Sequence, residues 1–581
     1  MITQSYKLNL IPDNFPVFVR CSQYDAESRT IEMTLYEGSA LYTIPNGATV
    51  TVRGTKQDGT GFEYPCTFSG SVVSFDIQAQ MTIFAGKVPS EIRITSNGEI
   101  LGSCNFYFLV ESTPLDSSTV ISESDLPLFE QVAQELPQAI EDIEWLKENI
   151  NKVYGIKRSL ATSSSAWERT NDSVGLNANA TFDGTDVVND FDNLYPWSKI
   201  KTVNMADNGT INAQIGDVNF KFDGTNGEVM TYIPPFYWKR WQDSSYEYIQ
   251  ISNNTFDGAS YSEGFYVGRY TTSSGHHSYS GVASLVNTNI TTFRTNAKAK
   301  GTGWGQMDYH YFLLQMLYLV EYADNNSQAK LGNGISSVRY VATDTATVAE
   351  TSVNRIIIAT DNSAYEVGTY INIGTSQGGT QVASMRKITS KETVTGGTAI
   401  NFDGTSVNIA VGNVLWGGQQ LLGECDSLGM KSGTLNNSGR HAMIYRGIEN
   451  LFGNIFQFVD GLNIKDNVAY ICYDQDEYTV DKFTSPYEQI GYTNATSNNY
   501  VKQMGYDSGH PLVGLPVAVQ SNATTTYYCD YYYQNAGNRI ARVGGYFGSG
   551  AAGGVFCWAL GDPSGVTFFG LGSRLLRKTV Q

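Results

Sequence analysis

The sequence has no run of 18 uninterrupted apolar residues, and its first residues lack the basic-then-apolar layout of a signal peptide. We therefore expect a chain made in a cytoplasm, without a membrane span or membrane insertion. Charged residues are also scarce, at 16% of 581, and the net charge is −18. Because an acidic chain repels the phosphate backbone, nucleic acid is not expected as a partner.

Metal-binding and disulfide patterns are missing as well. The seven cysteines are scattered, odd in number and never spaced as CxxC, and among the five histidines only His276 and His277 are neighbours. Neither zinc-type spacing nor a disulfide framework is present, and no loop carries the clustered carboxylates of a calcium site. We expect free thiols, no metal site and no cofactor.

Small polar residues and 37 tyrosines carry the polarity of the chain instead. Tyrosine offers a large contact area at low entropic cost, which suits an amphipathic recognition surface. The alternative is that all-β proteins are simply rich in Tyr and Thr. Composition alone leaves both interpretations open.

Residues 1–117 read as a small β-sandwich. Apolar and polar residues alternate over 30–36, 48–53 and 91–95, and Gly- and Asp-containing turn clusters separate these runs. The segment VRGTKQDGT at 52–60 and the final strand GSCNFYF at 102–108 resemble the N-terminal domain of phage baseplate upper proteins. This resemblance implies that the domain attaches the chain to baseplate or tail proteins.

Residues 118–156 form a helical linker, with the helix itself over 122–155. Apolar residues follow a heptad, Pro137 interrupts it, and the uninterrupted seam covers about 138–154. A helix this short is weak alone, so we expect a short parallel coiled coil that joins a homotrimer. The number three comes from the resemblance to phage fibres. The alternative is one amphipathic helix lying on a neighbouring domain.

Residues 157–336 and 416–581 are predicted to form an α+β head, and 337–415 an inserted β-subdomain, so the whole chain is mainly β. Strand patterns occur over 194–198, 218–224 and 230–237, one long helix is expected over 306–322, and alternation resumes at 337–341, 354–358 and 407–411. The sequences GIENLFGNIFQFVDG (447–461) and GFYVGRY (264–270) resemble the formylglycine-generating-enzyme branch of the C-type lectin fold. That resemblance implies a C-type lectin fold for the head.

The C-terminal segment has a Gly-rich framework around residues 542–556 and 572–578. It resembles the variable proteins of diversity-generating retroelements, which include the phage tropism determinants. Between Tyr546 and Ser573 there is no Asn, Lys, Glu, Gln or Met, and the residues there are mostly types reachable from an Asn codon by changing its first two bases. The alternative is an ordinary Gly-rich β-hairpin. Phe547 stands where the family usually has Trp, which leaves open whether it is scaffold or variable.

The resemblance implies that the variable positions are exposed, gather on one side of the head and bind the ligand. These positions are Tyr546, Phe547, Gly548, Ser549, Ala552, Ala559, Gly561, Asp562, Gly565, Phe568 and Phe569. The scaffold is expected to contain Phe556, Leu575, Gly544, Gly545, Gly554 and Gly572.

The sequence therefore predicts a phage receptor-binding protein, located in the virion, that binds a glycan or protein on the bacterial surface and is not an enzyme. One rival is an enzyme of the formylglycine-generating type. Its chemistry needs two reactive cysteines close together, whereas Cys529 and Cys557 are far apart in the sequence. A tail-associated glycan hydrolase is a further alternative. A surface adhesin of the bacterium itself is the third, weakened by the missing signal peptide.

Overall fold

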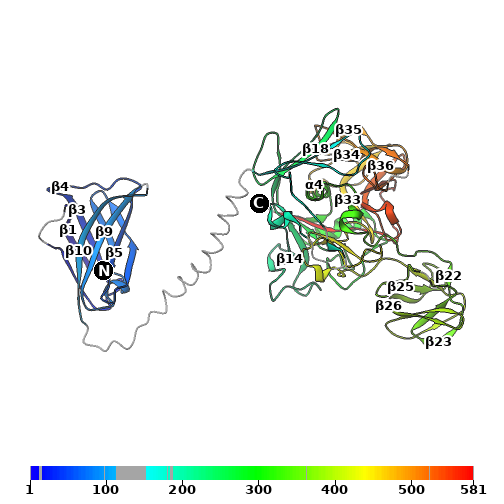
Figure 1. Ribbon diagram of the computed structural model, residues 1–581, viewed down its shortest axis with the longest axis horizontal. Coiled ribbons are helices and arrows are strands. Elements are labelled where there is room, and N and C mark those ends of the chain that lie inside the picture. The colour runs from blue at the N-terminus through cyan, green and yellow to red at the C-terminus, as the bar shows by residue number, and fades with distance from the viewer. Residues whose placement is uncertain are drawn as a thin grey trace. The chain divides into compact units, whose positions relative to one another are not determined.

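The computed structural model describes residues 2–112, without 12–15 and 97, and residues 152–579, without 180, 183–187, 362, 522 and 523 (Figure 1). The chain divides into an N-terminal unit within 1–139 and a C-terminal unit within 140–581. Strands predominate in both units, which confirms the predicted mainly β fold.

Two five-stranded sheets form the N-terminal unit and enclose one core, as expected for a β-sandwich. Alternate residues of β3, such as Ile31, Met33 and Leu35, point into that core. The predicted strands at 30–36, 48–53 and 91–95 are confirmed as β3, β5 and β9. The first sheet contains β1 (Ile2–Asn9), β3 (Arg29–Glu37), β4 (Ala40–Leu41), β7 (Thr67–Ser69) and β8 (Val72–Asp76). The second contains β2 (Phe18–Ser22), β5 (Thr49–Thr55), β6 (Gly61–Pro65), β9 (Gly86–Ser96) and β10 (Glu99–Glu111).

The predicted coiled-coil seam lies mostly outside the described residues, which resume at residue 152. The predicted end of its helix is wrong, because Val153 begins strand β11 (Val153–Ser159). This strand pairs along its whole length with β18 (Tyr246–Ser252). Sheet pairing therefore takes precedence over the heptad pattern at 153–155.

Four sheets build the body of the C-terminal unit. The five-stranded sheet contains β11, β12 (Glu168–Asn171), β17 (Phe236–Gln242), β18 and β19 (Ser260–Ser262). The six-stranded sheet contains β14 (Lys201–Met205), β15 (Ile211–Gln214), β16 (Glu228–Ile233), β20 (Phe265–Gly268), β21 (Trp304–Gln306) and β42 (Leu575–Lys578). The small sheet contains β13 (Thr181–Phe182), β30 (Gly433–Thr434), β31 (Met443–Tyr445) and β32 (Ile448–Glu449).

The nine-stranded sheet contributes the strands that flank the predicted ligand-binding residues. It contains β33 (Phe456–Lys465), β34 (Val468–Ile471), β35 (Glu488–Thr493), β36 (Asn499–Met504), β37 (Pro516–Gln520), β38 (Tyr531–Gln534), β39 (Asn538–Gly544), β40 (Gly554–Leu560) and β41 (Leu571–Gly572).

Helix α4 (His310–Tyr322) lies among these sheets, and every one of its residues is buried (Figure 1). The predicted helix over 306–322 is thus confirmed, but it begins later because residues 304–306 pair with β42 as β21. Two shorter helices, α3 (Ile290–Lys298) and α5 (Ser327–Leu331), were not predicted. No described helix is both long enough and apolar enough to cross a membrane.

The 337–415 segment contains two sheets with an apolar core of their own. The larger contains β22 (Asp344–Thr345), β24 (Arg355–Ile358), β25 (Tyr370–Gly374), β26 (Gln381–Val394), β27 (Gly397–Phe402) and β29 (Val414–Gly417), and the smaller contains β23 (Glu350–Val353) and β28 (Val407–Ile409). The strands expected near 354–358 and 407–411 are confirmed as β24 and β28.

Three expected strands are absent from the described residues. Residues 194–196 form a bend and a turn, 197–198 belong to a 3-10 helix, and 218–224 form turns, bends and loop. Residues 337–341 form no strand, because the N–H of Val338 donates to the carbonyl of Phe547 at 3.1 Å rather than to a neighbouring strand. The pattern over 230–237 is confirmed as the end of β16 and the start of β17, separated by Pro234 and Pro235.

Candidate ligand-binding face

Two loops, 545–553 and 561–570, connect the last strands of the chain, and they carry most of the predicted binding residues. Glycines permit their tight courses. Gly545 has a φ of +78°, and a Cβ there would lie 2.9 Å from the Cα of Gly553. A Cβ at Gly572 would lie 2.5 Å from the carbonyl oxygen of Leu285. The predicted scaffold residues are all buried, which confirms their placement.

Six aromatic rings gather where these loops meet the start of the insertion. The ring centroids of Tyr340 and Phe569 lie 4.4 Å apart in a stacked pair, and Phe547 lies 5.3 Å from Tyr340. Tyr546 lies 5.7 Å from Phe456 and 6.1 Å from Phe568. Such spacings are typical of rings in mutual contact. We call this cluster the aromatic face: Tyr340, Phe456, Tyr546, Phe547, Phe568 and Phe569.

Exposure differs strongly within the aromatic face. Phe569 is 40% exposed, and Tyr340, Tyr546 and Phe568 are half-buried. Phe547 is only 1% exposed, so the prediction that it is exposed is wrong. Its ring belongs to a small core with Val338 and Ala442, and its N–H donates to the carbonyl of Asn454 at 3.1 Å.

The predicted exposure of Ala559 is also wrong, since this residue is fully buried. It lies within β40, which is paired on both sides, opposite Arg542 of β39 and Tyr533 of β38. A residue inside a central strand of a covered sheet has no path to solvent. The codon argument holds for Ala559 as for its neighbours, but it contains no information about burial.

The other predicted residues lie at or near the surface. Gly548 and Gly565 are exposed, and Ser549, Ala552, Gly561 and Asp562 are half-buried. Ser549 is tied to Tyr546, because its Oγ accepts the N–H of Tyr546 at 2.9 Å. No contact in the described structure joins Ala552 or Gly565 to the rings. Their binding role stays a prediction.

Arg542, which was not among the predicted binding residues, links Asp562 to the aromatic face. Its guanidinium lies 4.3 Å from the ring centroid of Phe456 and 4.9 Å from that of Phe568, and it forms an ion pair with Asp562. Burial lowers the pKa of Arg542, and the carboxylate of Asp562 partly offsets this. The arrangement offers a cation over ring faces, a contact that holds aromatic side chains in place.

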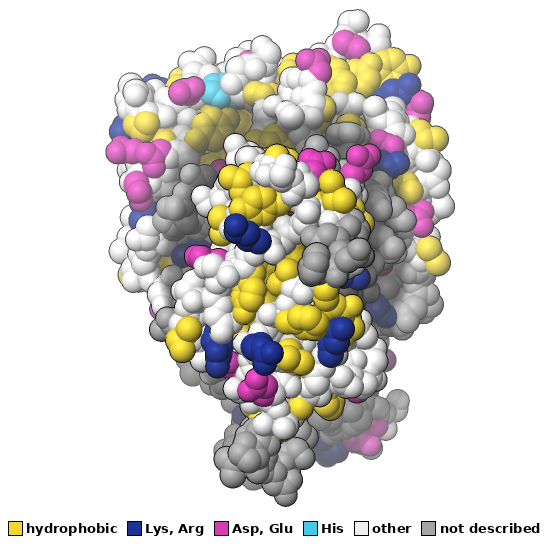
Figure 2. Space-filling view, turned by 90° about the vertical axis from the view of Figure 1, so that its left-hand side faces the viewer, with side chains coloured by type: hydrophobic (Ala, Val, Ile, Leu, Met, Phe, Trp, Pro, Cys, Tyr) yellow, Lys and Arg dark blue, Asp and Glu magenta, His cyan; other side chains and the backbone are white. Residues whose placement is uncertain are grey.

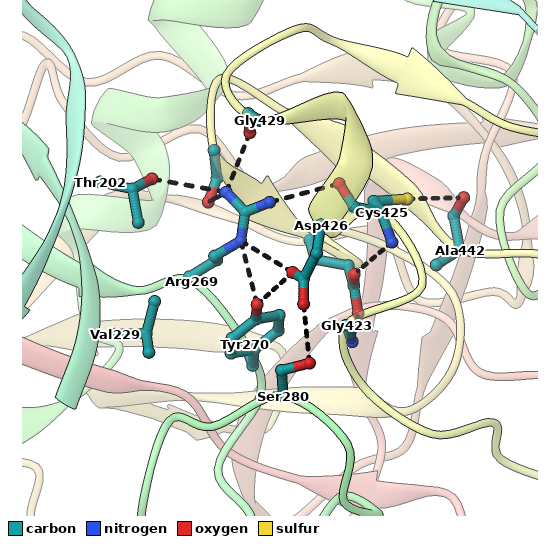
Figure 3. A network of polar contacts seen from close by, with 12 residues as sticks. Thr202, Val229, Arg269, Tyr270, Ser280, Gly423, Cys425, Asp426, Gly429 and Ala442 are labelled. Carbon is teal, nitrogen blue, oxygen red and sulfur yellow. Dashed lines mark hydrogen bonds and ion pairs between the residues drawn. The ribbon is translucent and has the colours of Figure 1, made fainter. Parts of the chain in front are cut away.

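A buried polar network lies in the same unit and fixes the 423–429 loop (Figure 3). The guanidinium of Arg269 donates to the carbonyls of Gly429 at 3.0 Å and Cys425 at 3.3 Å, and its Nε lies 3.5 Å from Asp426. The other carboxylate oxygen of Asp426 accepts the hydroxyl of Ser280 at 2.7 Å. Because Arg269 is fully buried, its guanidinium holds the backbone of this loop and is not available to a ligand.

Stability should fall with rising pH because of Glu449 in this region. Its carboxylate accepts the N–H groups of Gly423 at 2.8 Å and Cys425 at 2.9 Å, yet full burial raises the pKa of Glu449 to about 7. The folded chain therefore holds this proton more tightly than the unfolded chain. Its contribution is complete below the ordinary pKa of 4.5 and is lost as pH rises through about 7.

Urea unfolding at about pH 5 and about pH 8 should show roughly 2 kcal/mol or somewhat more of this loss. Glu449→Gln should remove that part of the pH dependence. The matched control is Glu477→Gln, at an exposed glutamate, which should leave the pH dependence unchanged. An identical pH dependence in the chain and in Glu449→Gln would contradict the assignment.

Metal and thiol chemistry have no evident site in the described part of the chain. Within it, no group of three or more His, Cys, Asp or Glu side chains is placed to hold a metal ion. All seven cysteines are free, and burial raises the pKa of Cys529 and of Cys557.

Comparisons with known proteins give little further information. No protein-family model matches this chain, and no curated protein matches it. Among solved structures, the N-terminal domain of phage TP901-1 ORF48 matches 19% of this chain and 99% of its own length, at 16% identity and a TM-score of 0.17. This TM-score is too low to establish a shared fold.

Proposed function

We propose that this chain is a phage tail or baseplate receptor-binding protein that binds a bacterial surface receptor through the aromatic face. One observation carries the proposal: Phe569 is 40% exposed and its ring stacks on that of Tyr340, with centroids 4.4 Å apart. Exposed aromatic clusters are unfavourable in water unless a partner covers them. Rigid rings with a dry border are also the usual hot spots of binding surfaces.

The two loops of this face can change residues at exposed positions without loss of the fold. Phe569, Gly548 and Gly565 are exposed and lie in loops, while the strands that flank the loops are buried. Most costly substitutions are those in a packed core, so loop positions tolerate many residue types. This agrees with the resemblance of residues 542–578 to diversified proteins.

The other parts of the chain have roles in the proposal too. The N-terminal unit exposes Ile2, Leu41 and Ile100, each by more than half, and apolar side chains lie between Lys and Arg side chains on the face drawn in Figure 2. Apolar surface of this kind is available for attachment to tail or baseplate proteins. The proposed assembly is a homotrimer, which light scattering of the purified chain can test.

Binding without turnover fits the state of the cysteines. A thiol attacks as its thiolate, and the buried thiols of Cys529 and Cys557 stay protonated at neutral pH because their pKa values are raised. The formylglycine-generating reaction relies on an accessible pair of reactive cysteines. We therefore propose an adhesin and not an enzyme of that type.

Phe569→Ala should weaken binding to bacterial cells by about 1–2 kcal/mol, or roughly 5- to 30-fold. The labelled full-length chain is incubated with a panel of bacterial strains, and binding is measured by flow cytometry. Phe18→Ala is the matched control, because Phe18 is 39% exposed and stacks on Tyr107 at 5.6 Å in the N-terminal unit. Both variants should melt within about 2 °C of the original chain.

Two results would contradict the proposal. One is that the chain binds no strain of a broad panel, including strains that adsorb the phage carrying it. The other is that Phe569→Ala and Phe18→Ala bind equally well, since removal of the exposed ring would then have no effect.

A further inference from the structure

A cavity of about 440 Å³ opens beside the N-terminal end of α4. Its walls come from β17, β19 and the end of β42. Two loops complete them, one after β34 and one between β36 and β37. The residues used below that line it are Trp238, Tyr261, Tyr309, His310, Tyr473 and Lys578. Its volume lies within the usual range of small-molecule sites. None of the predicted binding residues of the aromatic face lines it.

A buried carboxylate orients one polar group in this cavity. Asp308 is fully buried, and its Oδ1 lies 2.5 Å from Nδ1 of His310. Burial alone would raise the pKa of Asp308, but His310 and Lys578 outweigh this effect and hold the pKa below its usual value. The carboxylate is therefore charged. Because Nδ1 faces Asp308, Nε2 is the ring nitrogen left for a ligand. Nε2 has no hydrogen-bond partner among the described residues.

Aromatic rings form the other walls. Tyr309 stacks on His310 with centroids 4.4 Å apart, and Tyr473 meets Tyr309 edge-on at 5.1 Å. Tyr473 is 38% exposed and Tyr261 is 50% exposed, whereas Trp238 is buried at the base. Flat ring faces with hydroxyl groups at their edges suit a ligand that has both C–H faces and hydroxyl groups.

Charges in the cavity are balanced. The Nζ of Lys578 lies 3.3 Å from Oδ2 of Asp308, so the cation is already paired. Glu263 is exposed at the rim and disfavours an anionic ligand. A cationic ligand would meet Lys578 at the wall. An uncharged ligand therefore fits best.

We propose that this cavity binds a neutral sugar residue of hexose size, separately from the receptor-binding role of the aromatic face. The sugar packs a C–H face on the exposed ring of Tyr473, beside Tyr309, and one of its hydroxyl groups forms a hydrogen bond with Nε2 of His310. Such a site gives the C-terminal unit a ligand site in addition to the aromatic face.

Saturation-transfer NMR of the full chain with single sugars tests this proposal. The probes are glucose, galactose, mannose and N-acetylglucosamine, with glucuronic acid as the anionic comparison. At least one neutral sugar should bind with a Kd of about 1 mM or lower, and glucuronic acid should bind more weakly. Tyr473→Ala should weaken that binding about tenfold or more.

His310→Asn tests the role of Nε2, because the Asn amide keeps a donor to Asp308 and lacks the second ring nitrogen. It should weaken binding by a similar factor. Tyr261→Ala, at an exposed position, provides a variant that folds even if His310→Asn does not. Phe569→Ala is the control, since it alters the aromatic face and should leave sugar binding unchanged.

The proposal is overturned if no neutral sugar binds, if glucuronic acid binds more tightly, or if Tyr473→Ala and Tyr261→Ala bind as the original chain does. Loss of sugar binding in Phe569→Ala alone would move the sugar to the aromatic face. Failure at the cavity leaves the cell-binding test of the aromatic face unaffected, so the two outcomes are distinguishable.

Discussion

Arg574→Met should destabilise the C-terminal unit by about 4 kcal/mol or more, because it removes a buried guanidinium and with it the donor of five hydrogen bonds. The guanidinium of Arg574 is fully buried, and all five of its N–H groups donate at 2.7–2.9 Å. Its acceptors are the side chain of Gln457 and the carbonyls of Gly268, Arg269, Glu449 and Asn450.

The large effect follows from what the substitution leaves behind. Methionine fills much of the volume but donates nothing, so five buried acceptors lose a donor. The carbonyls of Arg269 and Asn450 keep one other donor each, from the N–H of Glu449 and the side-chain amide of Gln457. Each acceptor left without a donor costs about 1–3 kcal/mol. Replacing both sides of a buried polar contact can be neutral, but backbone carbonyls cannot be replaced.

Urea unfolding of the full chain, followed by tryptophan fluorescence, measures this effect. Arg577→Met is the matched control three residues along the chain, since Arg577 is half-buried, and it should cost less than about 1 kcal/mol. A loss below about 1 kcal/mol for Arg574→Met would show that water or a shifted backbone replaces its hydrogen bonds.

Phe547→Ala should cost about 3–5 kcal/mol of stability, although it lies in the aromatic face next to Phe569. Its ring is 1% exposed and packs against buried side chains of the 335–444 region, so alanine leaves a cavity. Phe569→Ala, in the same cluster, removes a ring that is 40% exposed and should change stability little. The pair therefore separates the scaffold part of the aromatic face from its binding part.

Thermal unfolding of these two variants makes the comparison directly, with the original chain as reference. Phe547→Ala should melt several degrees lower and Phe569→Ala nearly unchanged. Equal melting temperatures would mean that Phe547 is as accessible as Phe569, as the sequence had suggested.

The periodic patterns of apolar residues correctly predicted several strands and the long helix. Alternation predicted β3, β5 and β9, because each has one face toward a core and one toward solvent. The long apolar run before Tyr322 predicted α4, which is buried on all sides. The start of α4 was misplaced because residues 304–306 pair with a strand from the far end of the chain.

The candidate site was harder to predict because it depends on contacts between distant segments. Tyr340 was interpreted as part of a strand, yet it stacks on Phe569. Codon composition selected Phe547 and Ala559 along with their exposed neighbours, although strand pairing and packing bury both. Composition thus identified the segment, and only the fold separates its exposed residues from its buried ones.

The central claim is that exposed residues of the two loops determine which bacterial surface is bound. A library of chains randomised only at Gly548, Gly565 and Phe569 is panned against a panel of strains, and the melting temperature of each recovered variant is measured. We expect variants that bind strains the original chain does not bind, while melting within about 2 °C of it. If every folded variant keeps the original strain range, the account is contradicted.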